Sequence, residues 1–197
     1  LMEKYLDAAD QVLQAAPADR LLVVKPIARV SKNTVAKKIL EYHLPRAFRR
    51  PVGQEEFALY FTLFEKSLNK GDSFEDAIKL PLKAMLVSPN FLFRTEEEKP
   101  MDGAHNVNDF ELATRLSYFL WSSMPDDELF AQAYSNQLHE PAVLEAQVKR
   151  MLADKKARAF AENFAGQWLG INKLKTTVEP DRGRFPTYTK QLRDSLY

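Results

Sequence analysis

A short basic segment, residues 46–50, carries the side chains best suited to holding a ligand. Its three arginines, with a phenylalanine among them, are Arg46, Arg49 and Arg50. Guanidinium groups beside an aromatic ring suit phosphates and stacked bases, so the segment is a candidate interaction or nucleic-acid site. The acidic pair Glu55 and Glu56 follows closely and could bind these arginines instead, or an arginine could bind the last carbonyls of its own helix.

A second candidate group lies near the end of the chain, where Asn163, Gln167 and Trp168 surround Gly166 on an expected helix. Glycine inside a helix costs about 1 kcal/mol relative to alanine. Close approach of a neighbouring helix would offset that cost, and a ligand that reaches the backbone is the alternative. A deep pocket lined by Arg49, Asn163 and Trp168 would indicate a substrate site.

Nothing in the sequence predicts a catalytic residue, a metal site or a cofactor held by these residues. The chain has no cysteine, which excludes thiolate metal sites and covalent haem attachment within it. A zinc site needs three or four converging ligands, whereas the histidines lie far apart, at His43, His105 and His139. The acidic triplet 126–128 is better explained by helix capping than by a calcium loop, whose ligands are spread over many positions.

The balance of charge argues against nucleic acid and anionic membranes as partners. Lys and Arg number 28 and Asp and Glu number 27, so the formal net charge is +1 at pH 7. Domains that bind phosphate backbones usually carry a strongly basic face. No apolar run approaches the roughly 20 residues of a membrane-spanning helix. With 45% hydrophobic residues, the 197-residue chain is long enough to bury a core.

Helix start and stop signals place the candidate residues on an all-α fold. Apolar residues recur at helical spacing, and small polar residues precede the periodic stretches, with Asn108 and Glu111 forming a capping box. We expect a bundle-like array of about eight or nine helices in two packed helical subdomains. The expected helices cover residues 1–16, 31–46, 53–70, 74–87, 108–120, 123–134, 141–152, 154–169 and a last one from 187.

The sequence also predicts the local structure at four further places. Residues 21–24 are apolar and precede a proline, which favours an extended connector. Pro81 should kink its helix or lie in the first turns of a later start. Residues 91–93 should pack as an extended apolar plug. Ser123 should cap the next helix together with a nearby acid, with a proline in the first turn.

A charged stretch at residues 95–105 marks the expected boundary between subdomains, because it contains proline and glycine and has no periodicity. We therefore divide the chain into the tail of a preceding domain with its connector (1–30), a first helical subdomain (31–95) and a second one (106–197). Leu1 is not an initiator, and the last residues fall in a helical pattern. We thus expect a piece of a longer protein whose second subdomain is truncated.

Four segments resemble two neighbouring domains of unknown function. Residues 44–52, with the letters LPRAFRRPV, resemble the hallmark of the first domain, and residues 85–94 resemble its end. Residues 110–129 and 162–169 resemble its C-terminal neighbour. Both domains occur in large exported proteins of planctomycetes and related bacteria that also carry cytochrome c segments. Residues 1–16 look like the tail of a third such domain.

The resemblance implies a context rather than a reaction. It implies an exported, periplasmic parent protein that bears haem c elsewhere, and partners among the other domains of the polypeptide or a redox protein. No haem-binding residue is carried over to this chain. The main hypothesis is a non-catalytic helical scaffold or docking module. The alternatives are the substrate-pocket part of a periplasmic haem-dependent oxidoreductase, and nucleic-acid binding through the Arg46–Arg50 cluster.

Overall fold

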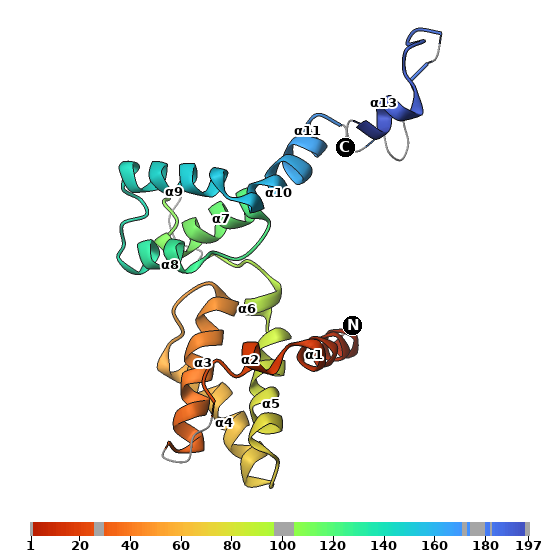
Figure 1. Ribbon diagram of the computed structural model, residues 1–197. Helices are drawn as coiled ribbons and strands as arrows, with labels where there is room; N and C mark the ends of the chain where they lie inside the picture. Colours follow the sequence, from red (N-terminus) through yellow and green to blue (C-terminus); the bar gives the residue numbers. More distant parts are fainter. Residues whose placement is uncertain are drawn as a thin grey trace.

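The computed structural model describes residues 2–25, 30–96, 105–170, 173, 180–181 and 183–195. Within these residues every regular element is a helix, which confirms the all-α prediction. Figure 1 shows two groups of helices, with the short helix α6 at the junction between them. We call α1–α6 the N-terminal unit and α7–α11 the C-terminal unit.

The N-terminal unit is built around three helices that pack against one another, α3, α4 and α5, with α1 beside α5. The helices are α1 (Met2–Ala15), α2 (Ala18–Leu21), α3 (Lys32–Phe48), α4 (Gln54–Asn69), α5 (Phe74–Leu86) and α6 (Pro89–Leu92). Its core contains the fully buried side chains Ile39, Leu44, Phe64, Ile78 and Leu82. Burying each of these stabilises the unit by about 1.5–3 kcal/mol.

Local side-chain caps fix where these helices begin, as the sequence predicts. The Ser31 hydroxyl accepts the N–H of Thr34 at 3.1 Å at the start of α3. The Ser73 hydroxyl accepts the N–H of Asp76 at 3.1 Å at the start of α5. Each bond satisfies a backbone donor that the helix itself leaves unpaired. After α4, Gly71 has a φ of 98°, which suits glycine.

Two prolines lie inside helices of this unit. Pro45 lies in the last turn of α3, which continues beyond the expected end at residue 46 to Phe48. Pro81 is fully buried within α5. The alternative of a later start for that helix is wrong, because the Ser73 cap begins α5 a full two turns before the proline. Its ring instead contributes apolar surface to the core.

Both connections that we expected to be extended contain a turn of helix. Residue 21 of the apolar segment 21–24 belongs to α2, and Leu22 is buried in the core of the unit. Residues 91–93 are not an extended plug, because α6 takes in the first two of them and Phe93 is 60% exposed. A proline at the first position of α6, preceded by a capping serine, favours this helical turn.

The C-terminal unit is a smaller array with a separate core. Its helices are α7 (Asp109–Trp121), α8 (Asp127–Tyr134), α9 (Pro141–Ala153), η1 (Lys155–Ala157), α10 (Arg158–Phe160), η2 (Ala161–Ala165) and α11 (Gly166–Trp168). Leu129, Leu138 and Met151 are fully buried. The Trp121 indole N–H donates to the Met151 carbonyl at 2.8 Å, which ties α7 to the end of α9. A further helix, α13 (Lys190–Ser195), lies beyond α11 in Figure 1.

Two expectations for this unit need correction. Ser123 does not cap α8; Asp126 does, by accepting the N–H of Leu129 at 2.9 Å, so the intervening proline precedes the helix. The single helix expected over 154–169 is divided into turns of different pitch, with a π-helical stretch at η2. The capping box at Asn108 is confirmed. Residues 97–104 of the expected linker lie outside the described residues.

His43 gives the N-terminal unit a pH dependence. Burial lowers the pKa of this imidazole, and this outweighs the hydrogen bond to the Leu21 carbonyl at 3.0 Å, which raises the pKa. The charge of Arg46 lowers it further. Because the folded-state pKa lies below the ordinary value of about 6.5, the unfolded chain binds the proton more readily. The folded state therefore loses stability as the pH falls below about 6.5.

We expect the urea-unfolding free energy to decrease between pH 7.5 and 5.5 and to level off below the folded-state pKa of His43. The His43→Gln variant keeps a donor for the Leu21 carbonyl but cannot be protonated, so its free energy should vary less over this range. The range lies above the pH at which carboxylates titrate. Equal slopes for the two proteins would show that His43 does not carry the effect.

Candidate functional site

The last turn of α3 presents the predicted arginine segment at the junction between the units. Arg49 ends this helix in the left-handed conformation, with a φ of 58°. Its guanidinium donates to three main-chain carbonyls of the α6 turn, those of Asn90 at 2.7 Å, Phe93 at 2.8 Å and Phe91 at 3.3 Å. Arg49 is only 6% exposed. The sequence allowed an arginine to bind the last carbonyls of its own helix. Arg49 does bind carbonyls at a helix end, but they belong to the α6 turn and not to α3.

Arg50 binds a carboxylate of the next helix. Its two terminal nitrogens donate to the two carboxylate oxygens of Glu56, at 2.8 and 3.0 Å. The Asn90 side-chain amide also donates to Glu56, at 3.0 Å. This carboxylate thus joins the end of α3, the start of α4 and the α6 turn. Of the two acidic partners considered for the arginines, Glu56 is the one that Arg50 uses.

Arg46 crosses from the N-terminal unit to the C-terminal unit. Its guanidinium lies 3.8 Å from the centroid of the Tyr42 ring and donates to Asp127 at 2.7 Å. The side chain of Asp127 is largely exposed, so this ion pair is worth at most about 1 kcal/mol. A second ion pair across the junction joins Glu96 to Arg115, with both N···O distances 2.6 Å.

The acidic triplet 126–128 serves as a cap and as a set of ion-pair partners. Asp126 caps α8 and accepts two hydrogen bonds from Arg150, at 2.6 and 3.0 Å. Its partial burial would raise the pKa of the carboxyl, but the bonds from Arg150 and the Leu129 N–H outweigh burial and lower the pKa. Glu128 lies 3.1 Å from Arg150. The capping interpretation is therefore confirmed, with structural ion pairs added to it.

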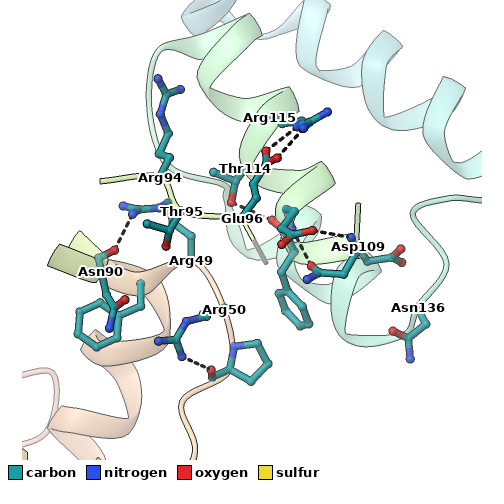
Figure 2. Close-up of a pocket in the computed structure, with 15 residues that line it drawn as sticks. Arg49, Arg50, Asn90, Arg94, Thr95, Glu96, Asp109, Thr114, Arg115 and Asn136 are labelled. Atoms are coloured by element: carbon teal, nitrogen blue, oxygen red, sulfur yellow. Dashed lines mark hydrogen bonds and ion pairs between the residues drawn. The ribbon is translucent and has the colours of Figure 1, made fainter. Parts of the chain in front are cut away.

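A cleft of about 800 Å³ lies between the two units (Figure 2). One wall comes from the end of α3 and the residues around α6, and the other from the first turns of α7. The charged residues of its lining are Arg49, Arg50, Arg94, Glu96, Asp109, Glu111 and Arg115. A cleft of this size and polarity can accommodate a small polar molecule.

The second predicted group lies elsewhere on the C-terminal unit. Asn163 donates to the Ser122 hydroxyl at 2.8 Å, and Trp168 is 76% exposed. Gln167 is exposed, whereas Gly166 is buried. The cleft thus contains Arg49 without Asn163 or Trp168. The structure brings the arginines together with one another but not with this second group.

Trp168 ends a ladder of aromatic rings on the surface of the C-terminal unit. Phe119 of α7 contacts Phe160 and Phe164 edge-on, with ring centroids 5.0 and 5.3 Å apart. Phe160 stacks on Phe164 at 5.2 Å, and Phe164 stacks on Trp168 at 6.2 Å. Phe119 is 50% exposed. We call these four residues the aromatic ladder, because they form one contiguous apolar strip.

Family comparisons match the chain in the order of its two units. Residues 35–96 match the family PSD5, protein of unknown function (DUF1595), and residues 107–197 match PSD4, protein of unknown function (DUF1592). The chain carries a DUF1595 domain followed by a DUF1592 domain. These are domains of unknown function, as the resemblance of their signature segments implied. Searches of curated proteins and of solved structures each found no match.

The DUF1595 domain contains the whole arginine segment, and the DUF1592 domain contains the aromatic ladder. Across residues 2–25, 30–96, 105–170 and the described residues after them, no group of three His, Asp or Glu side chains could hold a metal ion. Nor does any helix in these parts of the chain have the length and apolarity to cross a bilayer.

Two charged side chains that line the cleft, Arg94 and Asp109, were not singled out from the sequence. Arg94 lies over the ring of Tyr118, and Asp109 pairs with His139 while accepting the Leu138 N–H at 2.9 Å. The side chain of His139 is part-exposed. Partners about 25 to 30 residues apart leave no local pattern, so these contacts follow only from the folded structure, in which Arg94 of the DUF1595 domain meets Tyr118 of the DUF1592 domain.

Proposed function

We propose that the two domains form a non-catalytic helical scaffold or docking module of an exported, cytochrome c-associated protein. The contacts made by the three arginines of segment 46–50 support this proposal. Each of the three arginines holds one part of the fold against another. Arg49 binds main-chain carbonyls, Arg50 binds Glu56, and Arg46 binds Asp127. These contacts are structural, and they leave nucleic-acid binding through the cluster without support.

The aromatic ladder is the surface through which the module docks. Isolated apolar side chains are common on protein surfaces, whereas a contiguous exposed strip marks an interaction site. Large aromatic rings are the residues that most often anchor interfaces. The partner that the resemblance favours is another domain of the same polypeptide, since both domain families occur in multidomain proteins with cytochrome c segments.

Replacing Trp168 with alanine should weaken docking without unfolding the module. We expect residues 1–197 to bind the remainder of the parent polypeptide, supplied as a separate protein, and Trp168→Ala to weaken binding at least about tenfold. Because the side chain is largely exposed, the unfolding free energy should change by less than about 0.5 kcal/mol. Calorimetric titration and urea unfolding measure the two quantities.

Leu152 provides a matched control, because it is a half-exposed apolar side chain outside the ladder. Leu152→Ala should bind the remainder of the polypeptide as the unaltered chain does. Equal affinities for Trp168→Ala and the unaltered chain, or an equal loss in the Leu152 variant, would contradict docking through the ladder.

The cleft supports a second candidate function, the substrate-pocket part of a periplasmic haem-dependent oxidoreductase, although it is not the pocket of Arg49, Asn163 and Trp168 that the sequence singled out. Its polar lining comes from both domains and encloses enough volume for a small substrate. A substrate screen on the full-length parent tests this candidate. Turnover that falls in cleft variants and persists in Trp168→Ala would favour the oxidoreductase over the scaffold.

A further inference from the structure

We propose that an apolar pocket at the junction, separate from the cleft, binds a small aromatic molecule. The pocket has a volume of about 390 Å³ and lies between the last turn of α3 and α8, which lie close together in Figure 1. It shares no lining residue with the cleft or with the aromatic ladder. Its lining consists of Pro45 and Arg46 from the DUF1595 domain and Asp127, Phe130, Ala131 and Tyr134 from the DUF1592 domain.

The lining of this pocket is mostly apolar and carries no net formal charge. Four of its six residues are apolar or aromatic, and the two charged ones, Arg46 and Asp127, bind each other at 2.7 Å. Small-molecule sites are typically apolar hollows with a few polar groups. Water that lies against such a surface is released when an apolar ligand replaces it, and this release favours binding. The pocket therefore suits a ligand that is apolar and uncharged.

A flat ring on the α8 side of the pocket favours an aromatic ligand over an aliphatic one. The Tyr134 ring is held edge-on against Phe110, with the two ring centroids 4.9 Å apart. Tyr134 is nevertheless 54% exposed, so much of its surface remains open to a ligand. Aromatic pairs attract each other in offset-stacked and edge-on arrangements beyond the effect of the area that they bury.

Arg46 supplies a second flat surface on the α3 side. Its guanidinium packs against Tyr42, 3.8 Å from the ring centroid, and Tyr42 does not line the pocket. This ring therefore supports the guanidinium from outside the pocket, and the Arg46 side chain remains 30% exposed. Guanidinium planes stack on aromatic rings. Arg46 can thus stack on a bound ring while it keeps its ion pair with Asp127.

The volume limits the ligand to one or two rings. Small-molecule sites span about 300–1,000 Å³, and this pocket lies near the lower end of that range. Because the two domains supply different walls, the bound molecule would contact both of them. The proposal is independent of docking through the aromatic ladder and of substrate binding in the cleft.

Calorimetric titration of the intact 197-residue chain with 2-naphthol, a neutral two-ring molecule, tests the proposal. We expect saturable binding at a single site. Decahydro-2-naphthol has the same carbon skeleton and hydroxyl group but no aromatic ring, so it should bind about two- to tenfold more weakly. Equal affinities for the two compounds would overturn the assignment of an aromatic ligand.

Two substitutions locate the binding site. Ala131 is exposed and lines the pocket, so Ala131→Leu should fill the pocket without disturbing a core. It should weaken the binding of 2-naphthol at least about tenfold, because the added side chain and the ligand cannot occupy the same space. Tyr134→Leu keeps an apolar side chain and removes the ring, so it should weaken binding about two- to tenfold.

Ala146 of α9 provides the matched control, because it is another exposed alanine on a helix of the same domain, outside the pocket. Ala146→Leu should bind 2-naphthol as the unaltered chain does, and circular dichroism should show all variants folded. Absence of saturable binding, or unchanged binding by Ala131→Leu, would overturn the proposal. Saturable binding of N-acetyltryptophanamide without binding of 2-naphthol would overturn it in favour of an aromatic side chain from a partner protein.

Discussion

Replacement of Arg49 by alanine should destabilise the protein by about 3 kcal/mol, the largest effect expected for any charged residue of the chain. The change removes three charge-assisted hydrogen bonds and leaves main-chain carbonyls at the α6 turn without their donor. Each such bond contributes about 1.5–3 kcal/mol when buried, and bonds to one group are not additive. Urea unfolding monitored by circular dichroism measures the loss.

Two further variants separate the side chain from the backbone. Arg49 adopts a left-handed φ of 58°, which costs a residue with a side chain about 1 kcal/mol. Arg49→Gly should therefore be less destabilised than Arg49→Ala, although it removes more atoms. Arg46→Ala is the control for the loss of charge, because its ion pair is exposed, and it should cost at most about 1 kcal/mol. A loss in Arg49→Ala no larger than that would contradict the structural role.

Phe64 and Met151 should each control the unfolding of one domain. Both side chains are fully buried, one in each apolar core, and the two cores share no residue. Truncating such a side chain to alanine costs about 2–5 kcal/mol. We expect two transitions in differential scanning calorimetry, with Phe64→Ala lowering one midpoint by at least about 10 °C and leaving the other in place.

Met151→Ala should shift the transition that Phe64→Ala leaves unchanged. The exposed leucine Leu59 of α4 provides a control, and Leu59→Ala should move neither midpoint by more than a few degrees. One transition that moves equally in both core variants would show that the domains unfold together. That result would contradict the division of the chain into two subdomains.

The helices could be predicted because their signals are local. Ser31 and Asn108 precede apolar residues at helical spacing, and a cap acts within three residues of itself. One error, the start of α8, arose where two local signals compete. Ser123 and Asp126 are both suitable cap residues, and the structure uses Asp126, so the intervening proline precedes α8.

The candidate site could be predicted only in part. The sequence singled out Arg49 and Arg50 as chemically capable, and both line the cleft. The carbonyls that bind Arg49 lie more than 40 residues away, and Arg94 has no motif of its own. The π-helical stretch at η2 was not predicted from the sequence either. The cleft exists only because two separate cores meet there.

The junction between the domains differs in kind from their interiors. Two ion pairs cross the junction, Arg46 with Asp127 and Arg115 with Glu96. If these pairs separate, water can hydrogen-bond to each of the charged groups. These two ion pairs join part-exposed groups, whereas each core consists of buried apolar side chains. We therefore expect the junction to deform more readily than either core. A partner that docks on the aromatic ladder would then change its orientation relative to the DUF1595 domain without either core being deformed.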